Sequence, residues 1–185
     1  MTTVFTLLNS QFEYICKETI RANDASTRYK DQAALGFHTE LDHIKNLGEW
    51  LQSGSLAKNP EIHFLEVVEG LDLARPGLAT HKDPVLLVTE LEYRPGTAET
   101  ILPHWKSVYE KTRDDESGAL LWQLLKDPKD PNKLYVVHAY ESRDYLINVH
   151  AASKELKEMQ AFSKGIQTRV APIFLRKESG FLYKA

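Results

Sequence analysis

The sequence predicts an α+β fold built from ferredoxin-like split β-α-β-β-α-β units, and three observations support this prediction. Between residues 85 and 177, four apolar, β-branched stretches and two helical patterns follow one another in the order strand, helix, strand, strand, helix, strand. An internal repeat relates the segment from Tyr29 to His38 to the segment from Tyr140 to His150. The composition, 42% hydrophobic and 26% charged residues, is that of an ordinary globular protein.

The elements of the second half follow from local patterns. A strand over 85–93 ends at Arg94-Pro95-Gly96, and a helix follows for which Thr97 is the expected N-cap. Pro103 lies inside this helix and should kink it or weaken its first turns. The remaining elements are expected as two strands, one helix and a last strand, at 119–125, 134–140, about 143–162 and about 172–177. Both helices should cover one face of the sheet, and the other apolar face should pack against another sheet.

The repeat indicates the domain organisation. We expect residues 1–72 to form a degenerate ferredoxin-like repeat, residues 73–83 a linker rich in turn formers, and residues 84–185 a complete repeat. The first repeat is too short for the whole unit. One strand and one helix are therefore expected to be missing or reduced to Val4–Leu8 and Gln11–Ile20.

Charge, hydropathy and cysteine content exclude several classes of protein. The net charge of −3 gives no basic surface for nucleic acid, and no apolar run approaches the roughly 20 residues of a membrane-spanning helix. The N-terminus lacks the pattern of a secretory signal, and the single cysteine, Cys16, has no partner for an internal disulfide. A cytoplasmic location is therefore expected.

A family resemblance follows from the segment Leu134-Tyr135-Val136-Val137-His138-Ala139-Tyr140-Glu141-Ser142 and the helix after it, which carries His150. Together these resemble the antibiotic biosynthesis monooxygenase type of dimeric α/β barrel, over residues 84–177 and less completely over 27–72. The resemblance implies a homodimer and an enzyme of secondary metabolism. Members of this group oxidise anthrone or quinol-like polyketide intermediates with dioxygen and no metal or flavin. Others degrade haem, isomerise or cyclise small molecules, or have no demonstrated chemistry.

The family pattern also points to site positions. The oxygenases have an asparagine and a tryptophan on the third strand and a tyrosine on the second helix, and these places fall here on Val136, Tyr140 and Leu146. Only Tyr140 keeps an aromatic ring. The haem-degrading members have an asparagine on the first strand, which residues 85–93 lack, so haem is not expected.

The chemistry of the side chains selects His138, His150 and Tyr140 as candidate catalytic residues. Val136, His138 and Tyr140 share one strand face, and His150 lies one helical turn beyond Leu146. Either histidine could act as a base near neutral pH, and Tyr140 could hydrogen-bond to a phenolic oxygen. The alternative for all three is a purely structural role in the core.

Candidate substrate-binding residues complete the expected pocket: Trp105, Trp122, Val136, Leu146 and Asn148. The two tryptophans could wall a flat polycyclic ligand, although both also suit an ordinary core. No metal or organic cofactor is expected. His38 and His43 are off the i, i+4 spacing of helical metal ligands, and the sequence contains no glycine-rich phosphate loop.

The expected function is therefore a cofactor-independent enzyme that acts on a small aromatic substrate, most simply by oxygenation. An isomerase or cyclase on the same substrate class remains open, as does a non-catalytic small-molecule-binding barrel protein.

Overall fold

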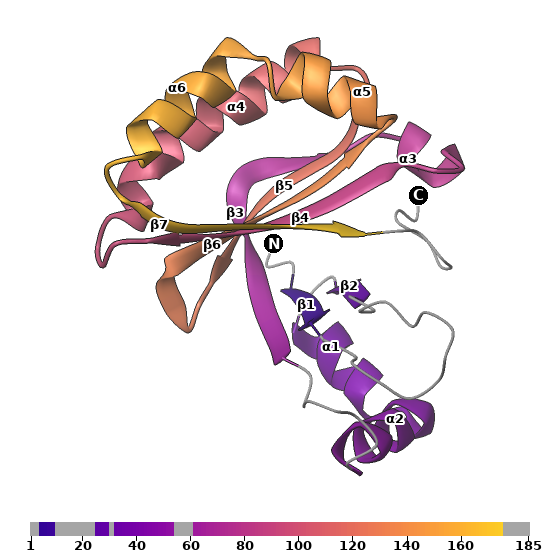
Figure 1. Ribbon diagram of the computed structural model, residues 1–185. Helices are drawn as coiled ribbons and strands as arrows, with labels where there is room; N and C mark the ends of the chain where they lie inside the picture. The colour runs from indigo at the N-terminus through magenta and orange to yellow at the C-terminus, as the bar shows by residue number, and fades with distance from the viewer. Residues whose placement is uncertain (1–3, 10–24, 30–31, 54–60, 176–185) are drawn as a thin grey trace, which may run out of the picture. The chain divides into compact units, whose positions relative to one another are not determined.

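The computed structural model describes residues 4–9, 25–29, 32–53 and 61–175, which divide into two compact units at Met1–Glu66 and Val67–Ala185. The expected helix over Gln11–Ile20 and the single cysteine, Cys16, lie outside the described residues. Each unit is described by itself below (Figure 1).

The first unit contains a small antiparallel sheet and two helices. Strand β1 (Val4–Asn9) pairs with β2 (Ala25–Tyr29) on one side and with the first part of β3 (Glu61–Ala74) on the other. Helix α1 (Gln32–Thr39) follows β2, and α2 (Asp42–Gln52) follows α1. The expected strand at Val4–Leu8 is confirmed by β1.

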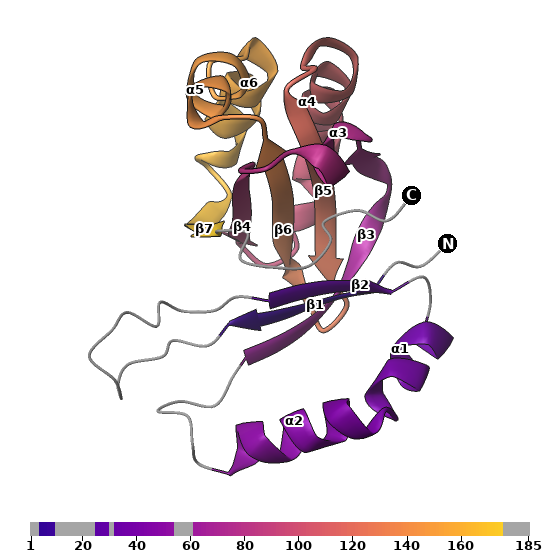
Figure 2. The same cartoon turned by 90° about the vertical axis from the view of Figure 1, so that its right-hand side faces the viewer.

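The second unit has the ferredoxin-like arrangement that the sequence predicts. Its antiparallel strands lie in the order β5 (Ala119–Asp127), β6 (Asp130–Tyr140), β4 (Val85–Tyr93), β7 (Gln167–Leu175). The second part of β3 lies next to β5. Figures 1 and 2 show α4 (Leu102–Asp115) and α6 (Lys154–Ser163) side by side over one face of this sheet. The α+β, ferredoxin-like prediction is confirmed.

The boundary region between the expected repeats is more structured than a linker. Strand β3 continues to Ala74, and residues Gly77–Thr80 form the short helix α3. The assignment of residues 1–72 and 84–185 as two repeats stays a prediction.

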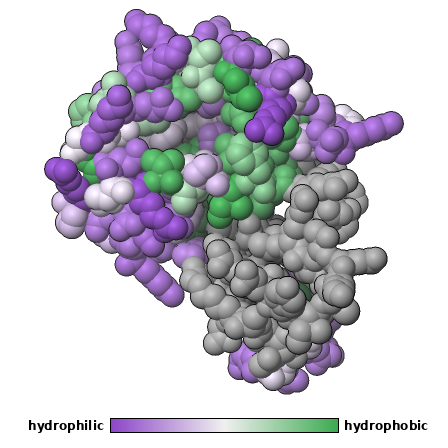
Figure 3. All heavy atoms as spheres, in the orientation of Figure 1, coloured by the Kyte–Doolittle hydropathy of each residue, from purple (hydrophilic) through white to green (hydrophobic). Residues whose placement is uncertain are grey.

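The core of the second unit lies between the sheet and its helices. Trp105, Val108 and Tyr109 of α4 pack against Trp122 of β5 and Val136 of β6, all less than a tenth exposed. Burial of each such side chain contributes roughly 1.5–3 kcal/mol to folding. Polar positions of the same helices face outward, and hydrophilic residues predominate over the outer surface of these helices in Figure 3.

The start of the first helix differs from the expectation. A 3₁₀-helix, η1 (Ala98–Ile101), comes first, and α4 begins at Leu102, so Pro103 occupies the first turn rather than the helix interior. At that position a proline interrupts no helical hydrogen bond, because the first N–H groups have no partner within the helix. Thr97 is the N-cap residue of η1, as expected, but its side chain makes no capping hydrogen bond, because its hydroxyl donates to the Arg94 carbonyl oxygen at 2.7 Å.

The sequence predicted one continuous second helix, but the structure divides it into three parts. A single turn, α5 (Arg143–Tyr145), leads into a π-helical turn, η2 (Leu146–His150), and α6 begins after an extended Ser153. The Ala151 N–H donates to the Leu146 carbonyl oxygen at 2.8 Å, five residues back. This wider turn leaves both Leu146 and His150 buried. Within the described ranges, no helix is long and apolar enough to cross a membrane.

Candidate functional site

Strand β6 places three of the expected site residues on the face that the helices cover. Val136 and Tyr140 are completely buried, and His138 between them is 6% exposed. In the register of the sheet, His138 lies opposite Trp122 of β5 and opposite Leu87 of β4. The alternation of the strand therefore brings together the residues that the sequence grouped on one face.

His138 and Tyr140 form a buried hydrogen-bonded pair. Nδ1 of His138 lies 2.9 Å from the Tyr140 hydroxyl oxygen. Burial, and then the charge of His150, hold the pKa of His138 well below its usual 6.5. Burial, and then the nearby Glu116 and Tyr145, raise the pKa of Tyr140 well above 10. Both side chains are therefore neutral near pH 7, and this pair can offer or accept hydrogen bonds without carrying charge.

His150 makes a second buried pair, with a residue that the sequence analysis did not select. Its Nδ1–H donates to Oε2 of Glu116 at 2.7 Å, and the two side chains are 3% and 1% exposed. A carboxylate on Nδ1 fixes the orientation of an imidazole and leaves Nε2 for proton transfer. The other carboxylate oxygen, Oε1, is buried and has no hydrogen-bond partner among the described residues.

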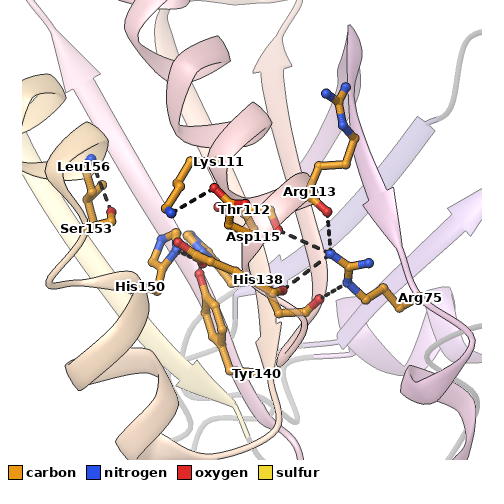
Figure 4. Close-up of polar contacts among 12 residues, drawn as sticks. Arg75, Lys111, Thr112, Arg113, Asp115, His138, Tyr140, His150, Ser153 and Leu156 are labelled. Carbon is orange, nitrogen blue, oxygen red and sulfur yellow. Dashed lines mark hydrogen bonds and ion pairs between the residues drawn. The ribbon is translucent and has the colours of Figure 1, made fainter.

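The two pairs are in contact through their rings. The centroid of His150 lies 5.0 Å from that of Tyr140 and 5.8 Å from that of His138. Figure 4 shows His138, Tyr140 and His150 pointing toward one another from β6 and η2. The structure therefore brings the three expected catalytic residues together, with Glu116 as a fourth member.

Glu116 is held in place by Arg75, which comes from the segment after β3. The Arg75 guanidinium donates from Nε to the Ala119 carbonyl oxygen at 2.9 Å and from Nη2 to that of Arg113 at 2.7 Å. Longer contacts reach the carbonyl oxygens of Thr112 and Glu116, at 3.3 and 3.4 Å (Figure 4). A cation at the carboxyl end of α4 satisfies carbonyl groups that have no helical partner and balances the helix dipole. Arg75 thus fixes the backbone on both sides of Glu116.

The expected tryptophans line the inner side of this cluster. Trp122 is completely buried, and its ring centroid lies 5.9 Å from Trp105 and 6.1 Å from His138. The indole N–H of Trp122 has no hydrogen-bond partner in the described part of the chain. Leu146 is buried against Tyr140. Asn148 is exposed, unlike the other four expected substrate-binding residues, which are buried.

A cleft of about 410 Å³ lies beside the cluster, between the end of α4 and the turn that leads from η2 into α6. Glu116 and Asn148 line it, together with Lys111 and Ser153. Another cleft, of about 310 Å³, lies in the first unit at Leu35 and Phe64. His138, Tyr140 and His150 line neither of these two clefts. Glu116 is therefore the member of the cluster that borders the larger one.

Glu116 and Arg75 could not be selected from the sequence, because their roles depend on segments far apart in the chain. The separation from Glu116 to His150 is 34 positions. One signal was present in the sequence. A carboxylate at the carboxyl end of a helix interacts unfavourably with the helix dipole, so a hydrogen-bond donor or a positive charge is expected next to it. Among the residues that the structure describes, no group of three histidine, cysteine or acidic side chains could hold a metal ion.

Comparisons with known proteins agree with this architecture. No curated protein matches the chain. A candidate monooxygenase of Lactobacillus acidophilus NCFM superposes with a TM-score of 0.68 at 14% identity, covering 95% of this chain and 77% of that one. One from Fusobacterium nucleatum gives 0.67 at 16% identity, covering 100% and 82%. At these identities, both show a shared fold.

A shorter structure matches about half of the chain. A candidate antibiotic biosynthesis monooxygenase of Bacteroides thetaiotaomicron gives a TM-score of 0.51 at 14% identity, covering 56% of this chain and 97% of its own. The model of the antibiotic biosynthesis monooxygenase family matches residues 84–161, which hold β4 to β6 and the helices around the cluster. The part of the chain from residue 84 to residue 161 is therefore similar to this family.

Proposed function

We propose that this chain is a cofactor-independent oxygenase that acts on an aromatic, anthrone- or quinol-like small molecule of polyketide origin. The observation that carries this proposal is the 2.7 Å contact between buried His150 and Glu116, in ring contact with the neutral His138–Tyr140 pair. A carboxylate–histidine pair is a common form of general base. The similarity of residues 84–161 to the antibiotic biosynthesis monooxygenase family supports monooxygenase-type chemistry.

The reaction needs only a base, dioxygen and confinement. The Glu116–His150 pair removes a proton from the enol or the activated methylene, and the electron pair stays on the substrate as a carbanion. This carbanion reduces dioxygen, and the two recombine to a peroxide. Loss of water from the peroxide leaves a carbonyl, so that a CH₂ group and O₂ give C=O and H₂O. The protein supplies orientation and exclusion of bulk water.

His138 and Tyr140 suit a second role in this scheme. Because both are neutral, they can hydrogen-bond to the oxygen on which charge develops without placing a competing charge in the site. His150, His138 and Tyr140 are thus proposed as catalytic residues, and Trp105, Trp122, Val136, Leu146 and Asn148 as residues that surround the substrate.

The test is turnover of an anthrone in air and under argon. We expect the quinone product in air only, with one dioxygen consumed for each product. Substitution His150→Ala should lower the rate about 10²–10⁴-fold, the usual contribution of a general base. His138→Ala is the comparison variant, and a larger loss there would move the base to β6. Equal product under argon would instead identify an isomerase or cyclase.

A second candidate function is non-catalytic binding of a small molecule. The observation in its favour is that Tyr140 and Trp122 are completely buried and that His138, Tyr140 and His150 line neither cleft. In that case the chain should bind aromatic ligands with the same affinity in air and argon and convert none of them.

A further inference from the structure

The buried cluster has a thin cover at its Tyr140 end. Because His138, Tyr140 and His150 line neither cleft, a ligand reaches them when a covering side chain moves. The buried apolar residues packed with Tyr140 are Leu87, Ala119 and Leu146. Two partly buried residues, Val85 and Tyr145, complete this cover. Val85 is held in β4 and pairs with Tyr140 in the sheet, whereas Tyr145 belongs to the single turn α5, so Tyr145 is the cover that can move most easily.

The ring of Tyr145 lies on the ring of Tyr140. The two ring centroids are 6.4 Å apart, and the rings are inclined by 26°. On the main-chain side the fit is close, since a Cβ added at Gly118 would lie 2.6 Å from the Tyr145 ring. Aromatic ligands prefer stacked or edge-to-face contacts with aromatic side chains. Tyr145 therefore occupies a place in which the ring of an aromatic ligand could stack on Tyr140.

Few main-chain hydrogen bonds hold the turn that carries Tyr145. Helix α5 has three residues, lies at one end of the helical layer and is followed by the π-helical turn η2 (Figure 1). The Tyr145 N–H donates to Oγ of Ser142 at 3.1 Å, and the Leu146 N–H donates to the Ser142 carbonyl oxygen at 3.1 Å. Short segments with few buried contacts open at a lower free energy than the whole fold. We therefore expect α5 to open while α4 and α6 stay packed on the sheet.

A row of side chains beneath α5 connects the edge of the sheet with the cluster. Phe174 of β7 lies opposite Leu87 of β4, and Leu87 lies opposite His138 of β6, so that all three share one face. Along this row the exposed fraction falls from 57% at Phe174 to 8% at Leu87 and 6% at His138. The Arg143 guanidinium of α5 lies over the Phe174 ring, 5.9 Å from its centroid. Movement of α5 would therefore uncover the row from the edge strand inward.

We propose that Tyr145 is the gate of the buried cluster. In the closed form its ring covers Tyr140, and outward movement of α5 lets an aromatic ligand take the place of this ring beside His138 and His150. This inference rests on the proposed function, since an enclosed base needs a way in for its substrate. It leaves the proposed roles of the cluster unchanged and adds the residue that controls access. The closed gate would also exclude bulk water during the reaction.

Access to the cluster can be measured without turnover by labelling with diethyl pyrocarbonate, which acylates the neutral imidazole ring of histidine. Mass spectrometry of tryptic peptides gives separate rates for His138 and His150, and the exposed His43 of α2 is the internal reference. In the native chain both should react at least about tenfold more slowly than His43, because a closed site reacts through its open fraction. Tyr145→Ala should raise both rates about tenfold or more. Tyr145→Phe keeps the ring and should stay within about twofold of the native chain.

Two variants and a urea series distinguish the gate from a general loosening of the fold. Gly118→Ala keeps Tyr145 but displaces its ring, so it should also speed the labelling of His150. Phe162→Ala is the matched control, since it removes a partly exposed aromatic ring that stacks on His104 of α4, and it should leave the rate at His150 unchanged. Opening of α5 exposes little surface, so the rate in Tyr145→Ala should hardly change at urea concentrations below the unfolding transition. Labelling through global unfolding would instead rise steeply with urea.

An unchanged rate at His150 in Tyr145→Ala or in Gly118→Ala would overturn the gate. So would a native rate at His150 equal to that at His43, or an acceleration that rises steeply with urea. The anthrone assay in air judges the oxygenase separately. Faster labelling of Tyr145→Ala in a protein that converts no anthrone would support the gate and reject the oxygenase, and turnover without any effect of Tyr145→Ala on labelling would do the reverse.

Discussion

Replacement of Arg75 by alanine tests whether this side chain holds the end of α4, and with it Glu116. The guanidinium makes two short hydrogen bonds, to the carbonyl oxygens of Ala119 at 2.9 Å and Arg113 at 2.7 Å. Hydrogen bonds from a charged donor contribute roughly 1.5–3 kcal/mol each. Because Arg75 is partly exposed to solvent, which screens its charge, we take the lower end of this range. The expected loss in the free energy of unfolding is about 2–3 kcal/mol.

Urea denaturation of the full chain, followed by circular dichroism, measures this loss. Arg169→Ala is the matched control, because Arg169 is 56% exposed and makes a single 2.8 Å contact with Glu90. Glu90 is 14% exposed and keeps Lys133 at 3.8 Å when Arg169 is removed, so the loss of this solvent-screened contact should cost roughly 0–1 kcal/mol. Arg75→Lys should recover little, since one ammonium group cannot reproduce the fork that contacts both carbonyls. If Arg75→Ala lowers the free energy of unfolding no more than Arg169→Ala does, the contacts of Arg75 with the end of α4 do not stabilise the fold.

Two further predictions concern packing and pH. Gly118→Ala should lower the free energy of unfolding by about 1–3 kcal/mol, because an added Cβ would lie 2.6 Å from the Tyr145 ring. Gly165→Ala is the control, since its added Cβ would meet nothing within 4 Å, and the same urea titration should show almost no change. Since the pKa of His138 is lowered in the fold, the unfolded chain binds more protons below pH 6.5, so stability should fall by up to about 1.4 kcal/mol per pH unit there. Comparing native and His138→Gln chains from pH 7.5 to 5.5 isolates this contribution, and identical slopes would show that His138 is not the group responsible.

The sequence predicted strand β4 more accurately than it predicted the second helix. The strand β4 begins and ends at the predicted residues, because alternation and the Arg94-Pro95-Gly96 terminator are local signals. The second helix was expected as one element, but η2 and Ser153 interrupt it. The π-helical turn accompanies the burial of Leu146 and His150 against the sheet, which is a tertiary interaction.

The sequence alone determined the ferredoxin-like class of the second half and the shared strand face of Val136, His138 and Tyr140. Both follow from periodicity, since the strand repeat of two residues places side chains on a known face. Only the tertiary structure decided which groups are paired. Glu116 meets His150 and Arg75 meets the end of α4 across intervals of 34 and about 40 residues. Such contacts have no local signal, because they depend on how the helices pack on the sheet, and packing is set by the whole set of apolar side chains rather than by any one segment.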